Sequence, residues 1–125
     1  MTQKRAGSSP GGPASSAGNE ILDHLRTLEA QGSPGVLAQV VEIFLLDNTV
    51  RLSALRDAIA RRDGEATYRV AHTMQGSAAM VGARSVAERC AELALAARSE
   101  AFDRCEALAG ELEAGIQAIQ RVVVG

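Results

Sequence analysis

The sequence predicts an all-α fold: an antiparallel, up-down four-helix bundle with a short additional helix at its N-terminal end. The chain is 46% hydrophobic but only 2% aromatic, and its richness in alanine and leucine is typical of helical proteins. Four consecutive segments carry apolar residues at helical spacing, and no segment alternates as a strand would. The short turns between these segments favour antiparallel neighbours.

Residues 1–18 are dominated by Gly, Ser, Ala and Pro and lack periodic apolar positions. They predict a disordered tail, a tag remnant or a linker, so the domain itself is expected to span residues 19–125. Asn19 can cap a short helix, which Gly32–Gly35 ends, and Ser33 is a candidate cap for the next one. The apolar stripe of the short helix is Ile21, Leu22, Leu25 and Leu28.

The next helix is long, because one apolar face persists from Leu37 to Ile59 and the helix ends at Arg61 or Arg62. Asn48 is the odd polar member of that face, so it either bonds inside the core or marks a bend. The apolar members are Leu37, Val41, Phe44, Leu52, Leu55 and Ile59.

A helix from Glu65 to about Val81, stopped by Gly82, divides into two faces at 100° per residue. Its apolar stripe is Thr67, Val70, Ala71, Met74, Ala78 and Val81. The nearly opposite face carries His72, Gln75, Gly76 and Ala79. A mid-helix glycine costs roughly 0.5–1 kcal/mol relative to alanine, so Gly76 calls for a reason.

The last two helices complete the bundle, with apolar stripes over residues 83–97 and 102–123. Cys90 and Cys105 belong to these stripes, and we expect them to be buried free thiols rather than a disulfide or a redox switch. Met74 and Met80 are expected in the core or at its rim. His24 has no second ligand at metal spacing and is expected at the surface.

Composition excludes several functions. The net charge is −2 with both signs mixed, so nothing indicates a nucleic-acid partner or an anionic membrane surface. No apolar run approaches the roughly 20 residues of a membrane-spanning helix, and the N-terminus is not a signal peptide. The cysteine pattern predicts a reducing cytoplasm.

The central motif resembles the signature of histidine-containing phosphotransfer (HPt) domains, Ala-His-x-Leu-Lys-Gly-[Ser/Ala] followed by Leu-Gly-Ala. The matching residues are Ala71-His72-Thr73-Met74-Gln75-Gly76-Ser77 and Val81-Gly82-Ala83. Residues 42–47 resemble the family's Phe-Leu-x-Asp helix, and residues 89–93 resemble its Cys-x-x-Leu-Glu helix. The chain departs from the family at Gln75, where lysine is usual.

The resemblance implies that His72 accepts a phosphoryl group, with the outer ring nitrogen, Nε2, as the expected site. A neutral imidazole offers a nucleophilic nitrogen at neutral pH; from the helical pattern alone, an ordinary surface histidine is the alternative. Gly76 is interpreted as clearance for a partner, against close helix packing. Gln75 can donate a hydrogen bond to the phosphoryl group but brings no charge.

Three further residues are supporting candidates. Arg69 could supply the missing positive charge or could simply pair with Glu65 one turn away, and the sequence leaves both open. Arg84 is a more distant source of charge. Ser77 could bond to the Thr73 carbonyl or to a neighbouring helix, or could serve as a small packing residue.

The function predicted by resemblance is a carrier in a multistep phosphorelay, not an enzyme. It would take the phosphoryl group from a receiver-domain aspartate and pass it to another receiver, with a hybrid histidine kinase as a further partner. No cofactor is expected in this chain, because the family's Mg²⁺ is held by the receiver. The protein would be free-standing in the cytoplasm or a module of a membrane sensor kinase.

Two rival functions remain. A phosphorylation-independent docking module would bind a receiver or kinase domain, and Gln75 favours it. A structural four-helix scaffold would require an extensive apolar seam on the surface.

Overall fold

The computed structural model describes residues 19–24, 26–27 and 34–124. The expectations for the tail at residues 1–18, and for Leu25, Leu28 and Ser33, lie outside the described residues. Within that part, the chain is helical apart from three short turns. The helices are α3 (Pro34–Ala60), α4 (Gly64–Met80), α5 (Arg84–Arg98) and α6 (Phe102–Val124), and residues 19–24 and 26–27 form a further helical stretch.

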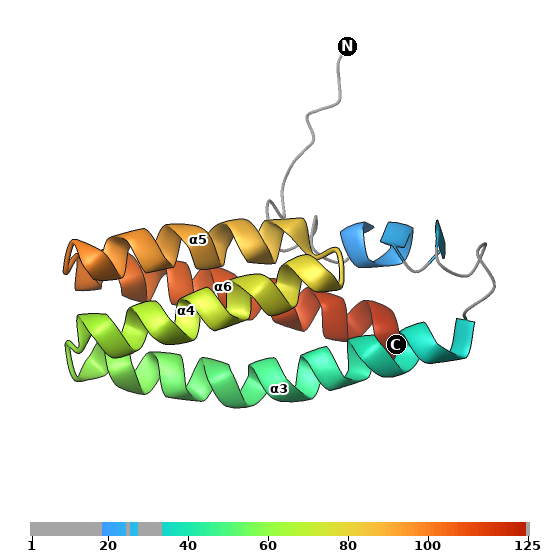
Figure 1. Ribbon diagram of the computed structural model, residues 1–125, viewed down its shortest axis with the longest axis horizontal. Coiled ribbons are helices and arrows are strands. Elements are labelled where there is room, and N and C mark those ends of the chain that lie inside the picture. The colour runs from blue at the N-terminus through green and yellow to red at the C-terminus, as the bar shows by residue number, and fades with distance from the viewer. Residues whose placement is uncertain (1–18, 25, 28–33, 125) are drawn as a thin grey trace, which may run out of the picture.

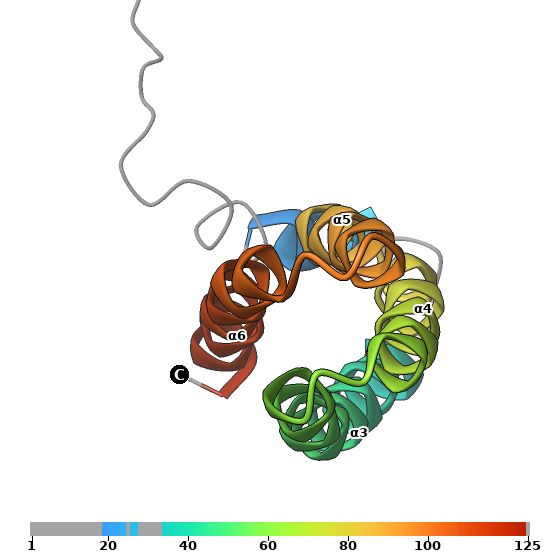
Figure 2. The same ribbon diagram turned by 90° about the vertical axis from the view of Figure 1, so that its left-hand side faces the viewer.

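The helices form the predicted up-down bundle. Figure 1 shows α3 beside α4 with the chain reversing at each turn, and Figure 2 shows α3, α4, α5 and α6 following one another around a common core. Contacts between α3 and α6 close the ring. The predicted helix limits agree with the observed ones to within a few residues, and α4 begins one residue earlier, at Gly64.

The core consists of small and aliphatic side chains from all these helices. Ile21 of the short helical stretch is also fully buried, as its stripe predicts. Fully buried members include Leu55, Ala71, Met74, Ala78, Cys90, Leu93, Cys105, Leu108, Leu112 and Ile119. Alanines at many of these positions let the helices approach closely.

The three turns share one backbone design. Residues Arg62, Gly82 and Glu100 all have positive φ, at 56°, 79° and 56°. At each turn, two backbone hydrogen bonds close back on the preceding helix, such as those from Ala83 N to Ala78 O and from Gly82 N to Ala79 O. This is the Schellman pattern, which favours glycine at the left-handed position. The chain uses glycine there only after α4.

Asp63 and Glu20 cap the two middle helices. The Asp63 carboxylate accepts from Ala66 N at 3.0 Å at the start of α4. At the start of α5, Ala83 offers no side-chain cap, and the Glu20 carboxylate accepts instead from Ser85 N and Ser85 Oγ at 2.8 and 2.7 Å. The short N-terminal helical stretch is therefore attached at the end of the bundle where α4 passes into α5, as Figure 1 shows.

Gly82 is favoured by its surroundings as well as by its positive φ. A Cβ there would lie 2.7 Å from Cγ of His24. His24 is half-buried with its imidazole over this turn, so it is less exposed than the sequence suggested. None of the described helices is long and apolar enough to cross a membrane.

Candidate functional site

His72 lies near the middle of α4 on its solvent-facing side. Its side chain is exposed, while the preceding Ala71 and the following Met74 are completely buried. This burial pattern is the one that the two-faced helix predicts, because residues separated by 100–200° point to opposite sides of a helix. The imidazole is thus presented to solvent by a helix that the core holds on its other side.

An aromatic ring lies against His72. The ring centroids of Tyr68 and His72 are 5.8 Å apart, with their planes within 12° of parallel. On α5, the guanidinium carbon of Arg98 lies 4.2 Å from the centroid of the same tyrosine ring. Sequence reasoning missed this arrangement. The available signal was that Tyr68, the single tyrosine of the chain, precedes His72 by one helical turn.

Gly76 lies one turn after His72 on the exposed face. A Cβ built at Gly76 would meet nothing within 4 Å, so close helix packing does not explain this glycine. Gln75, next to it, is half-buried. His72, Gln75 and Gly76 therefore share one outer surface with open space over the glycine.

Ser77 points toward α3. Its Oγ accepts a hydrogen bond of 3.1 Å from Nδ2 of Asn48, and the same amide donates to the Phe44 carbonyl at 2.8 Å. Asn48 is 1% exposed, so the odd polar residue of α3 bonds inside the core. This pair fixes α4 against α3 just beyond the histidine.

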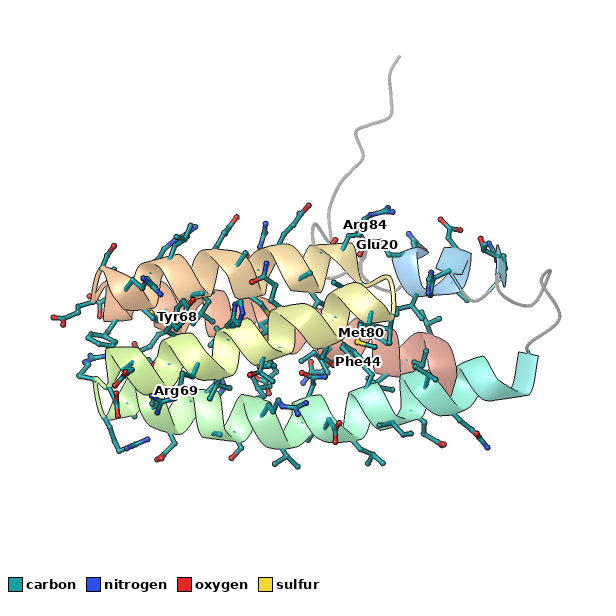
Figure 3. All side chains as sticks on the ribbon, viewed as in Figure 1. Glu20, Phe44, Tyr68, Arg69, Met80 and Arg84 are labelled. Carbon is teal, nitrogen blue, oxygen red and sulfur yellow. The ribbon has the colours of Figure 1, made fainter. Side chains whose placement is uncertain are left out.

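The two arginines that the sequence offered as sources of positive charge, Arg69 and Arg84, are placed differently. Arg69 forms an exposed ion pair with Glu65 at 3.6 Å, the ordinary arrangement that its spacing allows. Arg84 is exposed at the first residue of α5, and Figure 3 shows its side chain at the outer edge of α5, directed away from α4. Arg69 is therefore engaged by Glu65, and Arg84 points away from the helix that carries His72.

The cysteines belong to the core. Cys90 and Cys105 are free and buried. Burial raises the pKa of the Cys90 thiol to about 12 and also raises the pKa of Cys105, so Cys90 stays protonated at neutral pH. Among the described residues, no three His, Cys, Asp or Glu side chains gather as a metal site.

Large apolar side chains are exposed on α3 and at the end of α4. Ile43, Leu46 and Val50 are 58%, 67% and 71% exposed; we call these three the α3 stripe. Met80, the last residue of α4, is 82% exposed, so it lies outside the core. Sequence reasoning followed only the core side of α3 and missed its second apolar face.

Comparisons with known proteins agree with this geometry. Residues 39–122 match the family model of the Hpt domain. The crystal structure of histidine-containing phosphotransfer protein B (HptB) from Pseudomonas aeruginosa PAO1 superposes with a TM-score of 0.73 at 25% identity, over 82% of this chain and 88% of that chain. A comparison with curated proteins gives no match. The chain belongs to the Hpt family, whose members are phosphoryl carriers of phosphorelays.

Proposed function

We propose that His72 is the phosphoryl-accepting residue, which takes the group from the aspartate of a receiver domain and passes it to another receiver. The observation that carries this proposal is an exposed imidazole in the middle of α4 with open space over Gly76. His24, the other histidine, is half-buried against Gly82, and this position makes it the poorer nucleophile.

The transfer is a simple displacement at phosphorus. The in-plane lone pair of His72 Nε2 forms the N–P bond, and the P–O bond to the receiver aspartate breaks with its electron pair left on the carboxylate. The hydrogen on Nδ1 stays in place during this step. The reverse displacement, by a second receiver's carboxylate, regenerates the imidazole. Mg²⁺, held by the receiver, would neutralise charge on the phosphoryl oxygens.

The receiver is proposed to dock over His72 and toward the start of α3. Exposed apolar side chains support this surface, because Met80 on α4 and Val40 and Ile43 on α3 are 82%, 41% and 58% exposed. Exposed apolar side chains that gather in one patch are typical of protein contact sites, and the proposal assigns these three side chains to such a patch. The short helical stretch that carries Glu20 lies at the same end (Figure 3) and extends the surface. The hydrogen bonds from Ser85 to Glu20 also support a domain that begins near Asn19.

Gln75 makes a second function worth testing. Without the family's lysine, the phosphoryl group on His72 gains a hydrogen bond from the Gln75 amide but no charge. A docking module that binds a receiver without carrying the phosphoryl group is the alternative. Exposure of His72 and the open space at Gly76 favour transfer.

Phosphotransfer from labelled receiver domains tests the proposal. Receivers phosphorylated in the presence of Mg²⁺ are incubated with the wild type, with His72→Gln and with His24→Gln as the matched control. We expect acid-labile, base-stable label on the wild type and on His24→Gln, and none on His72→Gln. If a receiver binds the wild type and transfers nothing, the docking module becomes the better account.

A further inference from the structure

We propose that Tyr68 and Arg98 are positioning residues that set the orientation of the His72 imidazole for transfer. This inference rests on the proposed function of His72. It does not require either residue to touch the phosphoryl group.

The stack supplies the orientation that hydrogen bonds do not. The His72 ring stacks on the Tyr68 ring, with 5.8 Å between the ring centroids and 12° between the ring planes. An exposed histidine without such a neighbour would rotate freely between rotamers. Stacking restricts the ring plane while leaving its nitrogen-bearing edges open. Since the reacting lone pair lies in the ring plane, the stack directs the nucleophile without covering it.

Arg98 in turn holds Tyr68. Its guanidinium carbon lies 4.2 Å from the tyrosine centroid, well inside the range of a cation–π contact. Arg98 and Tyr68 line one surface hollow with Gly64 and Ala97, at the first turn of α4, whereas His72 follows Tyr68 by one turn. The tyrosine ring therefore contacts Arg98 of α5 as well as the imidazole one turn further along α4.

The backbone explains why Arg98 can reach the tyrosine. A Cβ at Gly64 would lie 2.9 Å from the carbonyl oxygen of Ala97, so the absence of a side chain lets the start of α4 approach the end of α5. Arg98 is the next residue after Ala97. The close approach thus delivers the guanidinium to the Tyr68 ring.

The decisive experiment compares two phosphoryl donors. Phosphoramidate is a small donor that can approach a ring nitrogen from any direction, whereas a docked receiver presents its phosphoryl group along one direction. Tyr68→Leu is expected to slow transfer from saturating phosphorylated receiver by about fivefold. This factor corresponds to the free-energy cost of immobilising one side chain. Receiver affinity and the rate with phosphoramidate are expected to stay at wild-type values.

Conservative variants and a charge control complete the set. Tyr68→Phe keeps the ring and is expected to transfer at the wild-type rate. Arg98→Leu is expected to slow transfer about twofold, while Arg98→Lys keeps most of the rate. Arg104→Leu, which removes an exposed arginine paired with Glu92 on the neighbouring helix, is expected to have no effect.

Nuclear magnetic resonance tests the stack directly. The Tyr68 ring current should shift the His72 ring protons upfield in the wild type and in Tyr68→Phe but not in Tyr68→Leu, with His24 as the internal reference. Unchanged His72 shifts, unchanged receiver transfer, or an equal loss with both donors in Tyr68→Leu would overturn the positioning role. A wild type that accepts nothing from any receiver would overturn the proposed function as well.

Discussion

The helix that carries His72 contacts its two neighbouring helices, α3 and α5, in different ways. On the α3 side, Ser77 is bound to a fully buried asparagine, Asn48, which also bonds to the Phe44 carbonyl. On the α5 side, Tyr68 is half-buried and its partner Arg98 is exposed. These buried hydrogen bonds fix the position of α4, and breaking them is expected to lower the free energy of unfolding substantially. The exposed stack of Tyr68 and Arg98 is expected to add little to the stability of the fold, and its proposed effect is to orient the His72 imidazole.

Replacing Asn48 should produce the largest stability change. Asn48→Ala removes both hydrogen bonds and leaves a cavity, so we expect the free energy of unfolding to fall by about 2–3 kcal/mol. Urea unfolding measures it, with Thr49→Ala as the control because the Thr49 side chain is exposed and bonds only within its own helix. Equal stabilities of the two variants would contradict the role of Asn48 as the buried residue that holds α4 against α3.

Gly82 extends the comparison to the end of α4. Gly82→Ala forces a side chain onto a backbone with φ of 79° and against the His24 ring, so a loss of about 1–2 kcal/mol is expected. Thermal unfolding followed by circular dichroism checks this value. A variant as stable as the wild type would show that the turn tolerates a Cβ and that His24 moves freely.

Gly76 should respond to the same substitution with the opposite sign. Because a Cβ there meets nothing, Gly76→Ala is expected to raise stability by about 0.5–1 kcal/mol through helix propensity. If Gly76 leaves clearance for the partner, as proposed, receiver-dependent transfer should nevertheless slow, because the methyl group would occupy that space. Unfolding and transfer are measured on the same preparation, and undiminished transfer would remove the clearance role from Gly76.

Gln75→Lys is expected to give the smallest structural change. The half-buried side chain gains a charge three residues after His72, so under the proposed function transfer should speed up or phospho-His72 should last longer, with unfolding unchanged. A chase of labelled protein after removal of the receiver measures the lifetime. If neither quantity changes, Gln75 has no part in stabilising the phosphoryl group.

The sequence predicted the bundle well because each helix repeats one apolar face and α4 separates its two faces cleanly. The sequence did not predict the contact between Tyr68 and Arg98, which lie on different helices. Arg98 is recognised as a neighbour of Tyr68 only when Gly64 has brought α4 and α5 together. Arg62 and Glu100 adopt left-handed backbone conformations, but because neither is a glycine, the sequence does not mark them as turn residues.

The α3 stripe shows a different limit. Ile43 and Val50 lie on the side of α3 opposite its core face, and both are more than half exposed. Apolar residues on both sides of a helix weaken the periodic signal that separates core from surface. By contrast, the bond from Asn48 was among the alternatives that its place in an apolar row suggested.

The most direct test of the central claim is the position of the phosphoryl group after one round of transfer from a receiver. Peptide mapping by mass spectrometry at neutral to basic pH, where phosphohistidine survives, locates it. The account predicts modification of the peptide that contains His72, matched by loss of label from the receiver. Modification at His24, or loss from the receiver with no gain on this protein, would contradict it.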